Sequence, residues 1–135
     1  MTEQLTTDKS PISLFLVDDV PELRELVRFG MEEDPAFEVV GEAGNGRAAI
    51  EGVSEKKPTV VLLDLSMPDM DGFAAIPELR SQNPDLVIIV LSGFPAIRMG
   101  DRAREQGADG YVEKGGPMSD LRDAIRDAVS ARRGA

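Results

Sequence analysis

Short apolar runs alternate with amphipathic stretches along the chain, and this alternation predicts five strands that are each followed by a helix. The strands are expected at residues 12–17, 37–43, 59–63, 86–91 and 110–113. The helices are expected at residues 21–33, 46–56, 73–82, 96–106 and 118–132. Repeated strand–helix units predict an α/β fold with a parallel sheet that has helices on both faces. Residues 60–63 and 86–91 are apolar throughout, as in central strands, whereas 37–43 is weaker and indicates an edge strand.

Apolar stripes indicate which helix faces are buried. Two stripes recur at helical spacing: Leu23, Leu26, Val27 and Met31 in the first helix, and Leu121, Ile125 and Val129 in the last. The third helix contains Pro77, and a proline inside a helix costs about 3 kcal/mol. We therefore expect this helix to begin late, near Phe73 or Ala74, so that Pro77 lies in its first turn, or to kink there.

Polar residues follow four of the five predicted strands. The acidic pair Asp18-Asp19 follows the first strand, Asp64 the third, Ser92 the fourth and Lys114 the fifth. Parallel strands joined by right-handed crossovers bring their carboxyl ends to one edge of the sheet, where ligands of open α/β sheets bind. We therefore expect these five residues to converge on one small surface.

The composition limits the chemistry of that surface. The 135 residues include no histidine and no cysteine, which excludes imidazole or thiolate catalysis, zinc sites of that kind and disulfides. The net charge of −10 argues against direct binding of nucleic acid. With no apolar run long enough to span a membrane and no signal-like N-terminus, we expect a cytoplasmic protein of one domain that does not bind membranes.

Three clustered carboxylates repel one another, and a divalent hard cation such as Mg²⁺ relieves that repulsion. Asp64 follows a buried strand and is the candidate nucleophile toward phosphorus. Asp19 is the candidate direct metal ligand, with Asp18 acting through water. Lys114 and Ser92 are candidates to bind the phosphoryl oxygens.

At these positions the sequence resembles the receiver domains of two-component response regulators. The resemblance spans about residues 11–132 and includes Asp18-Asp19, Asp64, Met67-Pro68, Asp71-Gly72, Ser92 and the segment Gly107–Lys114. It implies a flavodoxin-like, doubly wound (βα)5 fold with strand order 2-1-3-4-5. It also implies a receiver domain at 11–132, between a flexible tail at 1–10 and a short tail at 133–135.

The same resemblance implies a function. Asp64 would be phosphorylated by a histidine kinase or a phosphotransfer protein, with Mg²⁺ held by Asp19, Asp64 and the backbone carbonyl of Ser66. Ser92 and Tyr111 would form the switch pair that alters the face made by the fourth helix, fifth strand and fifth helix. The protein would then signal to a downstream protein target, as a monomer or a phosphorylation-dependent dimer. It would be a phosphoacceptor that assists its own phosphotransfer and dephosphorylation, not an enzyme.

Some positions depart from the commonest family pattern. Gly115 follows the lysine where many receivers have proline, which suits the subfamily usually fused to helix-turn-helix domains, although the sequence shows no such output domain. Ser92 replaces the commoner threonine. Ser66 and Phe94 occupy positions that tune the lifetime of the phosphoryl group, so the lifetime is left open.

Three other interpretations compete with this one. The chain could be a phosphorylation-independent interaction module that retains the fold. It could be an Mg²⁺-dependent phosphatase, although those usually carry a second acid where Ser66 stands. Gly44–Ala49 fits a dinucleotide-binding pattern, with a turn and a helix cap at Asn45 as the alternative. A cofactor at that segment would leave Asp18, Ser92 and Lys114 unexplained.

Overall fold

A computed structural model describes residues 10–65 and 72–134 of the chain. The strands are β1 (Ile12–Val17), β2 (Phe37–Ala43), β3 (Val60–Leu63), β4 (Val87–Ser92) and β5 (Gly110–Glu113). The helices are α1 (Pro21–Glu32), α2 (Gly46–Lys56), α3 (Gly72–Gln82), α4 (Ala96–Gln106) and α5 (Met118–Gly134). Each predicted element is present, with boundaries that differ by at most two residues. None of the helices in the described ranges is long and apolar enough to cross a membrane.

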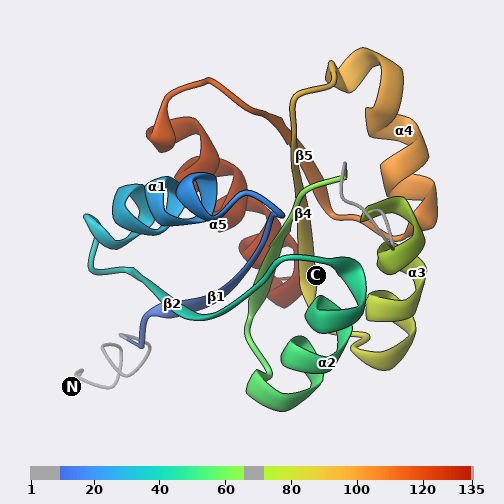
Figure 1. Cartoon of the computed structure of the whole chain (residues 1–135), viewed down its shortest axis with the longest axis horizontal. Helices are drawn as coiled ribbons and strands as arrows, with labels where there is room; N and C mark the ends of the chain where they lie inside the picture. Colours follow the sequence, from blue (N-terminus) through green and yellow to red (C-terminus); the bar gives the residue numbers. More distant parts are fainter. Residues whose placement is uncertain (1–9, 66–71, 135) are drawn as a thin grey trace.

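The described strands form a parallel five-stranded sheet in the order β2-β1-β3-β4-β5, which confirms the predicted fold and the edge position of β2. In Figure 1, α1 and α5 lie on one side of this sheet and α2, α3 and α4 on the other. The alternation of side chains along β1 shows why both faces are covered. Leu14 and Leu16 pack into the core under α1 and α5, while Phe15 and Val17 pack into the core under α2 and α3. The sheet is thus buried on both faces, and its strand ends remain the place for polar residues.

The apolar stripe of α1 is only partly buried, contrary to the simplest interpretation of its spacing. Met31 is fully buried and Val27 half-buried, but Leu23 and Leu26 are 37% and 62% exposed. Leu23 and Leu26 line a groove of about 320 Å³ between α1 and the segment after β5. The periodicity identified the apolar face of α1 but did not distinguish core packing from the wall of an open groove.

α3 begins at Gly72, one residue before the predicted start, but Pro77 lies inside the helix and not in its first turn as predicted. A kink at Pro77, the other outcome that we expected, stays a prediction. A proline at this position removes the hydrogen bond to the carbonyl four residues earlier, at Phe73. Pro77 itself is exposed, so its ring takes no place in the core. Meanwhile Ala75, Ile76 and Leu79 are fully buried, and their packing favours a helix through this segment despite the proline.

Asp34, in the loop between α1 and β2, links that loop to α5. Its carboxylate accepts a hydrogen bond from the Ala36 backbone N–H at 2.9 Å and lies 2.6 Å from Arg126 Nη2. The Ala36 hydrogen bond, followed by the interaction with Arg126, holds the pKa of Asp34 below its ordinary value. The charged carboxylate therefore stabilises the folded state above the ordinary pKa, and this contribution is lost as pH falls through the lowered pKa.

We expect Asp34→Asn to lower the melting temperature slightly at neutral pH, because the variant loses the charged partner of Arg126. The difference from wild type should shrink steadily in thermal melts as the buffer is taken below the ordinary carboxyl pKa. A difference that stays constant from neutral to strongly acidic pH would contradict this linkage.

Candidate functional site

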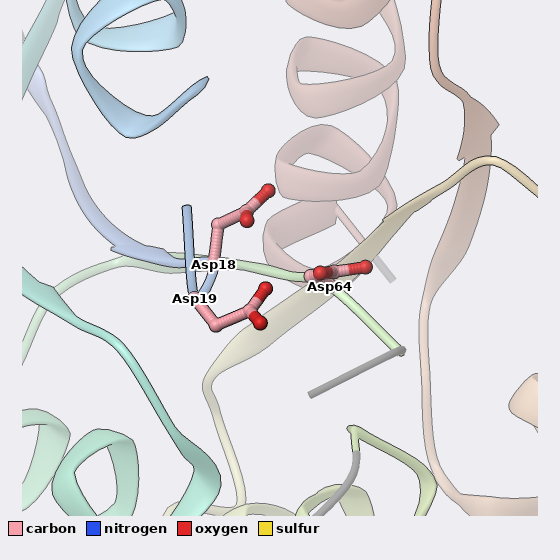
Figure 2. A group of neighbouring side chains, drawn as sticks. All are labelled: Asp18, Asp19 and Asp64. Atoms are coloured by element: carbon pink, nitrogen blue, oxygen red, sulfur yellow. The ribbon is translucent and has the colours of Figure 1, made fainter. Parts of the chain in front are cut away.

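Neighbouring strand ends bring the three predicted acids together. Val17 and Leu63 are register partners, so Asp18 and Asp64 leave β1 and β3 side by side. The Asp64 backbone N–H donates to the Val17 carbonyl at 3.0 Å and fixes this juxtaposition. One carboxylate oxygen from each of Asp18, Asp19 and Asp64 lies within 4.8 Å of the others. Figure 2 shows the three side chains gathered at these strand ends.

Burial gives the acids different environments. Asp18 and Asp64 are only 8% and 5% exposed, whereas Asp19 faces solvent. Buried carboxylates need compensating charge, and Lys114 supplies it. Its Nζ lies 3.1 Å from Asp18 Oδ2 and 3.5 Å from Asp64 Oδ1. The sequence-based expectation that one lysine adjoins the acidic residues is met by these contacts.

The end of β5 positions Lys114. Its backbone N–H donates to the Ser92 carbonyl at 2.7 Å, which ties the ends of β5 and β4 together. The chain then turns at Gly115, whose φ of 96° favours glycine over residues with a side chain. The backbone hydrogen bond to Ser92 holds Lys114 at the sheet edge, where its ammonium group contacts the two buried acids.

The two residues of the predicted switch pair contact the same residue of the loop after β4. The Ser92 hydroxyl, which is 1% exposed, accepts a hydrogen bond from the Phe94 backbone N–H at 3.0 Å. The Tyr111 hydroxyl donates to the Phe94 carbonyl at 2.7 Å. Phe94 therefore links Ser92 to Tyr111, and the Ser92 oxygen bonds its own loop in this conformation.

Sequence reasoning missed one residue that contacts the acidic turn. Arg24, one turn into α1, donates from Nη1 to the Asp18 carbonyl at 2.6 Å and from Nε to Glu42 Oε1 at 3.0 Å. An arginine in an amphipathic helix looks like an ordinary surface residue, so residue type alone gave no signal. Its position one turn after an acidic pair is the feature that could have identified it.

Two other predicted features have simpler outcomes. Ser66, predicted as a ligand through its carbonyl, lies outside the described residues, as do Met67, Pro68 and Asp71.

In the glycine-rich segment, Asn45 Oδ1 accepts a hydrogen bond from the Ala48 backbone N–H at 2.8 Å. Asn45 therefore caps α2, which is the local role expected for an asparagine at a helix start.

The donor set fits a hard divalent cation. Mg²⁺ prefers carboxylate and water oxygens and needs few protein ligands, and the trio offers three carboxylates with one exposed to solvent. An ammonium group next to such a cluster is the arrangement that binds phosphoryl oxygens. The fold and the site define a class: parallel-sheet α/β proteins with an acidic pocket and one lysine at the carboxyl ends of the strands.

Comparison with known proteins identifies the family within that class. Residues 14–126 match the response regulator receiver domain, and the chain belongs to this family of two-component signalling proteins. It is 37% identical over 121 residues to the response regulator protein VraR of Staphylococcus epidermidis, covering 85% of this chain and 55% of VraR. The chain thus spans about half the length of the curated relatives it matches.

Solved structures agree with this assignment. A two-component response regulator of the LuxR family from Aurantimonas sp. superimposes with a TM-score of 0.86 at 31% identity, covering 91% of this chain and 88% of that one. The signal receiver domain of a Mycobacterium tuberculosis response regulator assigned as NarL gives a TM-score of 0.83 at 29% identity, covering 93% and 99%. The predicted resemblance to the receiver domains of response regulators is therefore confirmed.

Proposed function

We propose that this receiver domain is a phosphorylation switch in which Asp64 accepts a phosphoryl group from a histidine kinase or a phosphotransfer protein, with Mg²⁺ as cofactor. The observation that carries the proposal is the contact of one ammonium group with two buried acids. Lys114 Nζ lies within 3.5 Å of carboxylate oxygens of both Asp18 and Asp64. A cation in this position can move to an incoming phosphoryl group without leaving the site.

Transfer of the phosphoryl group to Asp64 forms one P–O bond and breaks one P–N bond. A carboxylate oxygen of Asp64 attacks phosphorus as the P–N bond of the donor phosphohistidine breaks, and the imidazole nitrogen keeps the bonding electrons. The Lys114 ammonium donates to a phosphoryl oxygen, and its contact with Asp18 holds it nearby. Mg²⁺, when bound, neutralises charge on the phosphoryl oxygens and on the carboxylates.

The three acids would hold Mg²⁺ unequally. Asp18 already accepts hydrogen bonds from the Val20 backbone N–H at 2.9 Å and from Lys114 at 3.1 Å. Asp19 is exposed and has room to bind the metal directly. This supports Asp19 and Asp64 as direct ligands and Asp18 as a ligand through water. The backbone carbonyl of Ser66, which lies outside the described residues, is proposed as a further ligand from the resemblance to receiver domains alone.

The output signal would pass through Phe94. Phosphorylation would draw the Ser92 hydroxyl away from the Phe94 N–H toward a phosphoryl oxygen, and the Tyr111 hydrogen bond would transmit that shift. Phe94 and Ile97 are 47% and 94% exposed, so this change alters an apolar surface next to β5. A downstream protein would recognise the altered face formed by α4, β5 and α5.

The phosphodonor would approach from the side of α1. The apolar groove lined by Leu23 and Leu26 also includes Asp18 and Lys114 in its wall. A protein seated in this groove would bring a phosphohistidine next to the acidic pocket. In this proposal the chain is itself the phosphoacceptor and assists its own phosphotransfer, and it is not an enzyme that acts on a separate substrate.

Phosphorylation by a small donor tests the proposal. We expect the wild-type chain to gain one phosphoryl group from acetyl phosphate with Mg²⁺ and none with EDTA, as measured by intact mass. Asp19→Asn should need about tenfold more Mg²⁺ for the same yield, because it loses a direct ligand. Asp127→Asn, which removes the same charge from an exposed position on α5, is the matched control. A wild type that gains no phosphoryl group at any Mg²⁺ concentration would indicate the phosphorylation-independent interaction module instead.

A further inference from the structure

Arg24 contacts the backbone of the acidic turn and not its carboxylates. Its side chain is 19% exposed, and its Nη1 donates to the carbonyl oxygen of Asp18 at 2.6 Å. This carbonyl belongs to the peptide that joins Asp18 to Asp19. The guanidinium group therefore constrains the plane of the peptide that connects Asp18 to Asp19, two of the three clustered acids.

Two peptides flank Asp19: the Asp18–Asp19 peptide is held by Arg24, and the Asp19–Val20 peptide by the Val20 N–H bond to Asp18 Oδ1. The Asp18 backbone N–H donates to the Ala43 carbonyl at 3.1 Å, and the Asp18 carboxylate contacts Val20 and Lys114. Asp19 is exposed and follows immediately after the constrained peptide. Rotation of that peptide would swing the Asp19 carboxylate relative to Asp64, so the Arg24 hydrogen bond sets the direction in which Asp19 leaves the strand.

The interaction with Glu42 explains why Arg24 donates to the backbone carbonyl of Asp18 and not to a carboxylate of the cluster. A guanidinium group next to several acids would ordinarily pair with a carboxylate of the cluster. Here Glu42, in β2, accepts from Nε at 3.0 Å, and the planar fork then directs Nη1 to the Asp18 carbonyl. Arg28 pairs with the same Glu42 but has a different role, because its guanidinium contacts the far carboxylate oxygen.

We infer that Arg24 is a positioning residue that holds the Asp18–Asp19 peptide in the orientation needed to bind the divalent cation, with Glu42 aiming its guanidinium group. The inference rests on the proposed function, because it assigns Arg24 a role in the same site. A lysine could not replace it, since one ammonium group lacks the planar fork that reaches both partners.

Three variants of the full chain separate positioning from simple packing. Arg24→Met removes the hydrogen bonds, and Arg24→Lys retains the charge without the fork. Arg28→Met removes an arginine that contacts the other oxygen of Glu42, and it leaves both the Arg24–Glu42 ion pair and the Asp18 carbonyl contact in place. Calorimetric titration with Mg²⁺ should give an affinity about tenfold weaker for both Arg24 variants and unchanged for Arg28→Met. Melting temperatures in EDTA report any general loss of stability.

Each outcome has a defined meaning. If wild type binds no Mg²⁺ and accepts no phosphoryl group, the proposed function fails. If wild type does both and the two Arg24 variants bind Mg²⁺ as tightly as Arg28→Met, Arg24 serves packing only and the inference is overturned. An Arg24→Lys variant with wild-type affinity also overturns it, because charge alone would then suffice. Should Arg24→Met not fold, Arg24→Lys decides the question.

Discussion

Asp64→Asn should abolish phosphorylation by acetyl phosphate in the presence of Mg²⁺. The amide is nearly the same size as the carboxylate but is a very poor nucleophile, so the rate should fall by roughly 10³-fold or more. Intact mass spectrometry over a time course measures the loss. Asp64 is 5% exposed at the end of a buried strand, so a substitution of equal size leaves the packing around it unchanged.

The same variant should remain folded, which separates lost chemistry from lost structure. Removing one of three clustered negative charges relieves repulsion, so the melting temperature in EDTA should equal or exceed that of wild type. Added Mg²⁺ should stabilise the variant less than it stabilises wild type, because the metal has lost a charged ligand. If Asp64→Asn gains a phosphoryl group as fast as wild type does, the acceptor lies elsewhere and the proposal is wrong.

The fold was predictable because strand periodicity, strand length and topology give the same answer here. The apolar runs before Asp64 and Ser92 could only be central strands, and parallel connectivity then brought the polar residues after them to one edge. The acids and Lys114 followed from this rule without any knowledge of distances. The contacts of Lys114 with Asp18 and Asp64 confirm that these strand-end residues lie together.

Other features depend on packing that the sequence pattern does not contain. The stripe of α1 has the same spacing whether Leu23 faces the core or the groove, and only the position of the segment after β5 decides. Pro77 has a local cost that the burial of Ile76 and Leu79 outweighs. The role of Arg24 was missed, because one partner is on another strand, the other is a backbone carbonyl, and only its place in the first turn after the acidic pair gives a signal.

Replacing Lys114 with methionine should have the second largest effect, on both stability and phosphorylation. Without the ammonium group, the carboxylates of Asp18 and Asp64 face each other beneath the surface with their shared cation removed. We expect the free energy of unfolding in EDTA to fall by about 2 kcal/mol, less than for a fully buried pair because Lys114 is partly exposed. Phosphorylation should slow by about 10²-fold or more, since a donor to the phosphoryl oxygens is lost.

The change in melting temperature on adding Mg²⁺ tests the Lys114→Met prediction independently of the phosphorylation rate. The metal supplies positive charge to the same carboxylates, so it should raise the melting temperature of Lys114→Met by more than that of wild type. Lys114→Arg is the matched control: it retains the charge and most of the stability, but its larger planar group should not restore the phosphorylation rate. A Lys114→Met variant that is phosphorylated at the wild-type rate would show that the ammonium group serves only to neutralise the two acids, and that the charge on the phosphoryl oxygens is balanced without it.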